Sequence, residues 1–463
     1  METRIESDLI GELEVPLQAY YGVQTQRGIN NYKITGQPQY KFPEFVKAFG
    51  YVKKGAALAN YELNVLDKEI CDAIVKASDE VIAGKLDKEF PTDMIQGGAG
   101  TTTNMNANEV IANRALEILG HQKGEYIYCS PNDHVNGSQS TNDAYPTAIK
   151  IAIYLMNQGL MQRVRRTIDA FRAKGEEFKD IIKMGRTQLQ DAVPMTLGQE
   201  FNAFASSLEN ELLKLEFNAG LLLEINMGAT AIGTGLNAPK GYAELVTQKL
   251  VEITGLPLRK AKDLIASTPE TGGYVSYSGA LKTLALQTSK ICNDLRLLAS
   301  GPRCGLSEIH LPEMAPGSSI MPGKVNPVIP EVVNQTCFRV IGNDTCVAFA
   351  SEAGQLQLNV MEPVMSHAIM ESIVFLENAL DTLVEKCIQG IRANKESCVS
   401  KVHNSIGIVT ALNPEIGYKN STRIAKEALE TGRRISDLVI EQKLLTKEQL
   451  DKILDPQNML QSH

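Results

Sequence analysis

Residues 317–327 carry the side chains of this chain that are best suited to chemistry on a small anion. Lys324 supplies a positive charge and Asn326 supplies an amide. Ser318 and Ser319 add two adjacent hydroxyl groups. Two glycines and two prolines interrupt helical and strand hydrogen bonding, so the segment is predicted to be a loop. Because reactive loops are usually held on rigid scaffolds, we expect an anion-handling loop, with an ordinary polar surface connection as the alternative.

Three further clusters of hydroxyl and amide side chains lie where predicted elements begin or end. Residues 100–106 lead into a helix, residues 137–143 precede a helix that begins near Ala144, and residues 185–191 lie at a third boundary. Such hydroxyls, with the free N–H groups of a helix start, could hold a carboxylate. Taken singly, each cluster fits a helix cap or a turn better than a binding site. The four segments together weaken that simpler interpretation.

Long amphipathic helices must position these segments. Apolar residues advance by threes and fours over residues 197–222, 281–298 and 369–391, which is the spacing of one face of an α-helix. Helices of this length cannot bury their apolar stripes against a small globule. The stripes therefore predict helices packed side by side in a bundle, which other subunits could complete.

The N-terminal part is predicted to be helical in shorter pieces. Composition favours helix over residues 53–82 and again over residues 106–119. The first 50 or so residues are mixed and aromatic, and residues 20–27 look like an irregular arm. Strands are hard to find, and only short hairpins are plausible.

The C-terminal part is predicted to form a small separate domain. After Asn394 the apolar pattern shortens into amphipathic helices that include residues 424–431 and 446–454. Thr446 and Gln449 stand at the positions of a capping box. The fold class is therefore mainly all-α, with an N-terminal, mostly helical domain over residues 1–140, a central long-helix bundle over residues 141–394 and a C-terminal helical domain over residues 395–463.

The composition argues against several classes of function. The chain has 463 residues, a formal net charge of −8 and a sequence pI near 5.5, without a block of lysines or arginines. No nucleic-acid or acidic-membrane surface is expected, because either would need such a block. The acidic N-terminus lacks the features of a signal peptide, and no apolar run reaches membrane-spanning length. We therefore expect a cytoplasmic protein that acts on a small molecule.

Cysteine and histidine spacing gives no sign of a metal centre. The eight cysteines are scattered without a CxxC pair, so free thiols are expected. The six histidines lack the spacing of zinc ligands. No metal is therefore predicted in the site.

Residues 317–327 resemble the signature loop of the fumarase/aspartase superfamily, whose pattern GSSxMPxKxN is matched here at every fixed position. Residues 100–109, 139–147 and 185–200 resemble the other regions that this superfamily shares. Within the superfamily, the resemblance is closest to the aspartate ammonia-lyases, which convert L-aspartate reversibly to fumarate and ammonia. It implies a mostly α-helical homotetramer with a central helix bundle, in which three subunits contribute to each active site.

The resemblance also implies how the site would work. Removal of a proton next to a carboxylate places a second negative charge on that group, giving an aci-carboxylate, so hydrogen-bond donors must gather there. Ser318 is the implied proton acceptor, and positive charge and backbone N–H groups must activate it. The implied substrate contacts are the hydroxyls of Thr101, Ser140, Thr141 and Ser319 at the β-carboxylate, Thr187, Lys324 and Asn326 at the α-carboxylate, and Asn142 and Gln188 at the ammonium group.

Gln188 distinguishes two activities within the superfamily. Fumarases that resemble this chain carry histidine there, and loss of hydroxide as water needs a proton that glutamine cannot supply. An ammonium group is already protonated and can leave as ammonia, so Gln188 favours L-aspartate over malate. Fumarate hydratase is the alternative enzyme, and a catalytically silent structural member, like some lens crystallins, is the alternative from another class. Intact Ser318, Lys324 and Asn326 argue against a silent protein.

No organic cofactor is expected, because the substrate carboxylate itself accepts the electrons of the broken C–H bond. Activation by a divalent cation outside the catalytic centre, as in some relatives, is compatible with the resemblance. Ser130 stands where related chains often carry histidine before Pro-Asn, which weakens the case for the secondary anion site of fumarases. Glu331 is a candidate for a proton relay, or simply a carboxylate favoured by a helix dipole.

Overall fold

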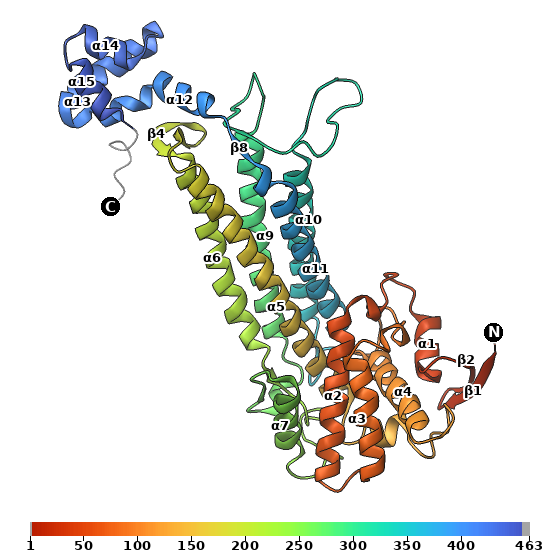
Figure 1. Cartoon of the computed structure of the whole chain (residues 1–463). Helices are drawn as coiled ribbons and strands as arrows, with labels where there is room; N and C mark the ends of the chain where they lie inside the picture. Colours follow the sequence, from red (N-terminus) through yellow and green to blue (C-terminus); the bar gives the residue numbers. More distant parts are fainter. Residues whose placement is uncertain (1, 456–463) are drawn as a thin grey trace. The chain divides into compact units, whose positions relative to one another are not determined.

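The chain is mainly α-helical in the computed structural model, which describes residues 2–455 (Figure 1). The predicted fold class is therefore confirmed. The α-helices of the described residues are α1 (Val23–Asn31), α2 (Pro43–Glu62), α3 (Lys68–Ile82), α4 (Thr101–Ile118), α5 (Thr141–Glu177), α6 (Leu197–Leu221), α7 (Tyr242–Thr254), α8 (Leu264–Ser267), α9 (Gly272–Leu298), α10 (Val328–Glu352), α11 (Glu362–Lys386), α12 (Lys395–Asn404), α13 (Val409–Thr431), α14 (Ile435–Glu441) and α15 (Lys447–Ile453).

Strands are short and pair two by two. Among the described residues, three of the four sheets are antiparallel and the pair of β5 and β6 is parallel. Two of the pairs are the expected short hairpins, and the other two join segments that lie far apart in the sequence. The pairs are β1 (Thr3–Asp8) with β2 (Gly11–Pro16), β3 (Ile182–Thr187) with β4 (Gln190–Thr196), β5 (Glu224–Ile225) with β6 (Arg259–Lys260), and β7 (Ile309–His310) with β8 (Arg392–Ala393).

The chain divides into two compact units, each built from three separate stretches of sequence. The boundaries between the units fall inside the long helices α5, α6, α9, α10 and α11. The three sequence-predicted domains follow other boundaries and stay a prediction. Of the described residues, unit 1 comprises residues 2–161, 213–283 and 339–375, and unit 2 comprises residues 162–212, 284–338 and 376–455.

In unit 1, buried polar contacts join neighbouring long helices. The Tyr277 hydroxyl on α9 donates to Asn157 Oδ1 on α5 over 2.9 Å. Asn343 Nδ2 on α10 donates to Glu371 Oε2 on α11, also over 2.9 Å. Because buried polar groups must find partners, these bonds fix which helix faces meet as well as stabilising them.

In unit 2, an aromatic cluster joins α5 to α6. The rings of Phe171 and Phe204 lie 5.6 Å apart between centroids, and those of Phe178 and Phe201 lie 5.2 Å apart. Edge-to-face packing at this distance is favourable beyond the area that it buries. The apolar stripe predicted over residues 197–222 is thus part of the core, as the periodicity indicated.

The N-terminal region is more ordered than its sequence suggests. The β1–β2 hairpin is followed by α1, so an irregular arm over residues 20–27 is wrong from Val23 onward. The buried Glu109 carboxylate on α4 accepts bonds from the N–H groups of Gly22, Gln24 and Thr25 at 2.8–3.1 Å. This carboxylate satisfies the free N–H groups at the start of α1 from a distant part of the chain, which local sequence does not show.

Two helices begin earlier than predicted. α4 begins at Thr101 rather than near Asn106, and α5 begins at Thr141 rather than near Ala144. In each case the later residues of the polar cluster form the first helical turn instead of preceding it. Hydroxyl and amide side chains that weaken a helix interior are favoured at its start.

The C-terminal segment forms α12 to α15, among which α13 and α15 contain the predicted helices over residues 424–431 and 446–454 to within a residue or two. α13 bends at Gly417, whose φ of 78° lies in the left-handed region that suits glycine. The capping box is present, because Thr446 Oγ1 accepts from the Gln449 N–H while the Gln449 side chain accepts from the Thr446 N–H. The hydrophobic core of this C-terminal segment contains Ile424, Leu438 and other buried apolar residues.

All eight cysteines are free thiols. Six are buried, Cys346 is partly buried and Cys304 is exposed.

Candidate functional site

In unit 1, the start of α4 presents Thr101. Gly100 precedes it with a φ of 86°, and a Cβ at Gly100 would come within 2.6 Å of the Tyr145 ring. Glycine is therefore needed both for the backbone conformation and for space. The exposed Thr101 hydroxyl donates to the Gly98 carbonyl over 2.8 Å, so it must give up this bond before it can donate to a substrate.

Ser140, Thr141 and Asn142 lie at the start of α5, where Asp143 fixes the backbone. The Asp143 carboxylate accepts from the Ser140 N–H at 2.9 Å and from two N–H groups of the segment after β5, those of Gly228 and Thr230. Burial raises the pKa of Asp143 to about 6, against the opposing effect of these hydrogen bonds. The three predicted residues are thus held on a rigid helix start rather than on a mobile loop.

The Asn142 amide has a defined orientation. Its Nδ2 donates to the Ala231 carbonyl oxygen over 2.7 Å. A carbonyl oxygen can only accept, so the Asn142 Oδ1 must point the other way. This orientation leaves Oδ1 as the acceptor of the side chain, and the contact of Asn142 with an ammonium group stays a prediction.

Behind this helix start lies a buried lysine that the sequence analysis missed. Lys53 on α2 is fully buried, and its Nζ lies 2.7 Å from Asn104 Oδ1 and 2.8 Å from Gln139 Oε1. Burial lowers the pKa of Lys53 to about 7, against the attraction of the Asp143 carboxylate. Asn104 in turn donates to Thr141 Oγ1 over 3.2 Å, which ties α4 to the start of α5.

A local sign could have revealed Lys53. It shares a helix face with Phe49, Ala56 and Ala57, which lie four residues before it and three and four residues after it, and all three are buried. A lysine on an apolar helix face is a candidate for burial with polar partners.

In unit 2, Thr187 and Gln188 lie at the tip of the β3–β4 hairpin. Thr187 pairs with Gln190, so Gln188 and Leu189 form a two-residue turn with φ values of 53° and 64°. Such turns usually contain Asn-Gly, because both residues need a positive φ. A residue other than glycine is strained at a positive φ, and such strained residues tend to occur at functional sites.

The base of this hairpin is fixed by charge. Glu308 is fully buried and lies 3.1 Å from Lys183 Nζ and 2.6 Å from Arg186 Nη2. Lys183 also contacts Glu200 at 2.5 Å. A buried carboxylate needs such partners, so the network anchors the strand that leads to Thr187.

Also in unit 2, the signature loop is closed at its neck. The Gly317 N–H donates to the Lys324 carbonyl and Asn326 Nδ2 donates to the Gly317 carbonyl, each over 2.7 Å. A side chain at Gly317 would collide with the Lys324 carbonyl. Ser319 and Lys324 are exposed, and their side chains make no hydrogen bond within residues 2–455.

Within this loop, the Ser318 oxygen is surrounded by backbone donors. Its Oγ accepts from the Ile320 N–H over 3.2 Å and from the Met321 N–H over 3.0 Å. Two N–H groups aimed at one oxygen are the arrangement that stabilises a developing oxyanion. The arrangement favours removal of the hydroxyl proton.

The structure thus joins some of the predicted residues and leaves others apart. In unit 1 the starts of α4 and α5 are joined through Asn104 and Thr141. In unit 2 no hydrogen bond among the described residues connects the hairpin tip, residues 187–190, with the loop, residues 317–326.

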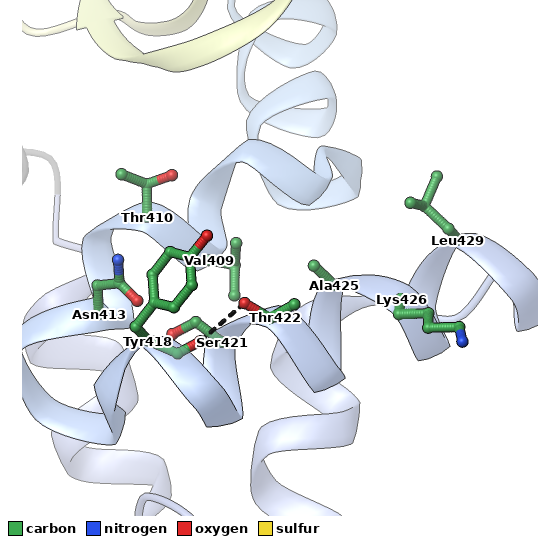
Figure 2. Close-up of a pocket in the computed structure, with 9 residues that line it drawn as sticks. All are labelled: Val409, Thr410, Asn413, Tyr418, Ser421, Thr422, Ala425, Lys426 and Leu429. Atoms are coloured by element: carbon green, nitrogen blue, oxygen red, sulfur yellow. Dashed lines mark hydrogen bonds between the residues drawn. The ribbon is translucent and has the colours of Figure 1, made fainter.

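A surface hollow of about 380 Å³ lies elsewhere, along α13 (Figure 2). No predicted site residue lines it, and its lining carries a single charged side chain, that of Lys426, which lies 3.8 Å from Glu430. It does not suit a dicarboxylate. Its lining residues are Val409, Thr410, Asn413, Tyr418, Ser421, Thr422, Ala425, Lys426 and Leu429.

The described part of the chain has neither a cluster of metal ligands nor a membrane-spanning helix. Over that part, no group of three or more histidine, cysteine, aspartate or glutamate side chains could hold a metal ion. Nor does any of its helices combine the length and apolar character needed to cross a membrane.

The fold and these segments are those of a helical lyase. The chain matches the family model described as "Lyase" over residues 11–342 and the model described as "Fumarase C C-terminus" over residues 408–461. Since the first match spans more than half of its length, the chain belongs to this lyase family. The resemblance to the fumarase/aspartase superfamily is confirmed.

Three relatives define its position within the family. The chain is 57% identical to an aspartate ammonia-lyase of Escherichia coli (strain K12), over 99% of this chain and 96% of that protein. A solved structure named fumarate lyase:delta crystallin from Brucella melitensis, bound to cobalt, is 50% identical, with a TM-score of 0.96 over 99% of each chain. A class II fumarase from Schistosoma mansoni is 35% identical, with a TM-score of 0.93 over 100% of each chain.

Proposed function

We propose that the chain is an aspartate ammonia-lyase, which eliminates ammonia reversibly from L-aspartate and gives fumarate. The main structural support for this chemistry is that Ser318 Oγ accepts hydrogen bonds from two backbone N–H groups within an intact signature loop. The observation that favours aspartate is the higher identity to an aspartate ammonia-lyase, 57%, than to a fumarase, 35%.

Proton removal is the first step. Ser318, as the alkoxide, takes the proton from the carbon next to the β-carboxylate, and the electron pair of the C–H bond moves into that carboxylate. Ile320 and Met321 support this role, because their N–H groups lower the energy of the negatively charged oxygen. The hydroxyls of Thr101, Ser140, Thr141 and Ser319 then stabilise the second negative charge of the aci-carboxylate.

Loss of ammonia is the second step. The electron pair returns from the aci-carboxylate to form the carbon–carbon double bond, and the C–N bond breaks to release neutral ammonia. Asn142 holds the ammonium group through its free Oδ1, and Gln188 accepts a second hydrogen bond. Neither residue needs to supply a proton. Thr187, Lys324 and Asn326 hold the α-carboxylate.

We also propose that the working form is a homotetramer whose active sites each draw on three subunits. Leu213, Phe217 and Leu221 are spaced by four residues on α6 and are 65%, 71% and 43% exposed. An exposed apolar stripe of this kind is typical of a surface that another chain covers. The cytoplasmic location, the absence of a cofactor and activation by a divalent cation stay predictions from the sequence.

A steady-state assay tests the function. Purified protein should raise the ultraviolet absorbance of fumarate when L-aspartate is added, and the reverse reaction should consume fumarate only when ammonium is present. L-Malate should give no comparable rate. A faster rate with L-malate would support fumarate hydratase instead, and no rate with either substrate would support a silent structural protein.

A further inference from the structure

Lys53 is a buried ammonium group without a role in the steps above. Its Nζ faces three side-chain oxygens, those of Asn104 at 2.7 Å, Gln139 at 2.8 Å and Asn136 at 3.3 Å. The protonated form of Lys53 is fully satisfied by these three oxygens, because an ammonium group has three N–H donors and no acceptor. Lys53 therefore fixes the orientation of each of these amides.

Asn104 passes this constraint on to Thr141. Because its Oδ1 faces Lys53, its Nδ2 must point away, where it donates to Thr141 Oγ1 over 3.2 Å and to Asn136 Oδ1 over 3.1 Å. Asn136 Oδ1 also accepts from Asn108 Nδ2 over 3.1 Å. A flipped Asn104 would set an amide NH2 group against the ammonium and an oxygen against Asn136 Oδ1, so only one orientation satisfies the network.

The Thr141 hydroxyl is thereby left with its hydrogen free. An amide NH2 group cannot accept, so the Thr141 oxygen is the acceptor of the bond with Asn104, and the hydroxyl hydrogen must point elsewhere. Within residues 2–455 this hydroxyl donates to no protein group.

We propose that Lys53 and Asn104 are positioning residues that hold the Thr141 hydroxyl as a hydrogen-bond donor to the substrate carboxylate. This inference rests on the proposed function, in which that carboxylate gains negative charge in the transition state. A donor that is oriented before the reaction stabilises that charge without reorganisation, whereas a freely rotating hydroxyl must first be turned.

Asn104→Asp is the decisive variant, because it keeps the bond from Lys53 and reverses the bond to Thr141, although it also removes the bond to Asn136. The new carboxylate still accepts from Lys53 and forms an ion pair with it, so the network keeps its cation. A carboxylate cannot donate to Thr141, so the Thr141 hydroxyl instead donates to it and turns away from the substrate. We expect kcat with L-aspartate to fall on the order of 100-fold, with KM changed far less.

A double-mutant cycle separates this effect from a general disturbance of the fold. Thr141→Val removes the hydroxyl, and adding Asn104→Asp to it should cause no further loss of kcat. Lys53→Met, which frees the Asn104 amide to rotate, should lower kcat in wild-type Thr141 and not in the Thr141→Val background. Lys54→Met is the matched control, because Lys54 is the next residue along and pairs with Asp79 outside the network.

The outcomes distinguish the two proposals. The positioning role would be overturned if Asn104→Asp kept the kcat of the wild type, or if it lowered kcat equally with and without the Thr141 hydroxyl. In both cases the wild-type enzyme would still deaminate L-aspartate, so the proposed function would stand. If Asn104→Asp does not fold, the Lys53→Met arm decides by the same comparison. An inactive wild-type protein would instead reject the proposed function, and the positioning role with it.

Discussion

Ser318 is the residue on which the proposed chemistry depends. The N–H groups of Ile320 and Met321 surround its oxygen, so the alkoxide is stabilised by the loop itself. Ser318→Ala removes the proton acceptor and leaves the hydroxyl and amide groups that bind the carboxylates. We expect kcat to fall on the order of 100-fold or more, measured as fumarate formation, with substrate binding retained.

Ser400→Ala is the control for this variant, because Ser400 is an exposed serine on α12 and outside every proposed site. It should behave like the wild type. Near-normal turnover of Ser318→Ala would exclude the serine as the base and would leave Glu331 as the next candidate.

Among single residues, those that carry the proposed chemistry could be predicted from the sequence, whereas the residues that orient them could not. Ser318 and Lys324 belong to a specific loop pattern, and Thr141 belongs to a polar cluster at a helix start. Lys53 carries no such pattern, and Asn104 lies in the polar cluster of residues 100–106 without being distinguished from its neighbours, because the role of both residues arises from burial and from partners that folding brings together. The orientation of an amide depends on its neighbours in space, and sequence spacing does not encode it.

Among the elements, the segment after α1 depends on one carboxylate. Asp93 accepts hydrogen bonds from the N–H groups of Ile34, Thr35, Gly36 and Ile95 at 2.8–3.1 Å, and from the Thr35 hydroxyl. Burial raises the pKa of Asp93, but these bonds outweigh burial and hold it below 3.8. The native state therefore favours the ionised form more than the unfolded state does.

A pH dependence follows from the sign of this shift. The stability that Asp93 contributes is fully present above its unfolded pKa of 3.8 and is lost as the pH falls through its lower folded pKa. Asp93→Asn should lower the free energy of unfolding by about 1–3 kcal/mol at pH 7. The difference from the wild type should stay constant down to about pH 5 and narrow below about pH 4, measured by urea unfolding.

Asp72→Asn is the matched control, because Asp72 forms an exposed ion pair with Lys68 one turn away on α3. It should change stability by less than about 1 kcal/mol. A difference between Asp93→Asn and the wild type that widened on acidification would contradict the expected sign.

The sequence predicted those helices whose formation depends on residues close together in the chain. The stripe on α6 repeats along the helix itself, so its existence and buried face could be predicted from residues 197–222 alone. α1 could not, because the N–H groups at its start are satisfied by Glu109, more than eighty positions away. The starts of α4 and α5 were misplaced by a few residues, since threonine and asparagine fit a first turn as well as the loop before it.

For the whole molecule, the apolar stripe on α6 predicts assembly. Phe217→Glu places a charge in the centre of the stripe, which should disfavour its burial against another chain. The wild type should have four times the chain mass of 50.6 kDa in light scattering, and the variant a smaller mass and lower activity. Lys76→Glu, at an exposed position of α3, is the control for a new surface charge.

If Phe217→Glu kept both the mass and the activity of the wild type, the stripe would not be an interface. A wild-type protein with the mass of one chain would contradict the tetramer altogether. Loss of mass with full activity would reject the sharing of active sites among subunits and leave the chemistry of Ser318 untouched.

The uneven burial of the cysteines has a practical consequence. Burial raises the pKa of Cys129, Cys337 and Cys387 to about 12, so these thiols stay protonated and unreactive near neutral pH. Cys304 is exposed and lies in the stretch of unit 2 that leads to the signature loop. A maleimide dye would attach there first, which gives a fluorescent reporter in the stretch before the loop without the need to engineer a cysteine.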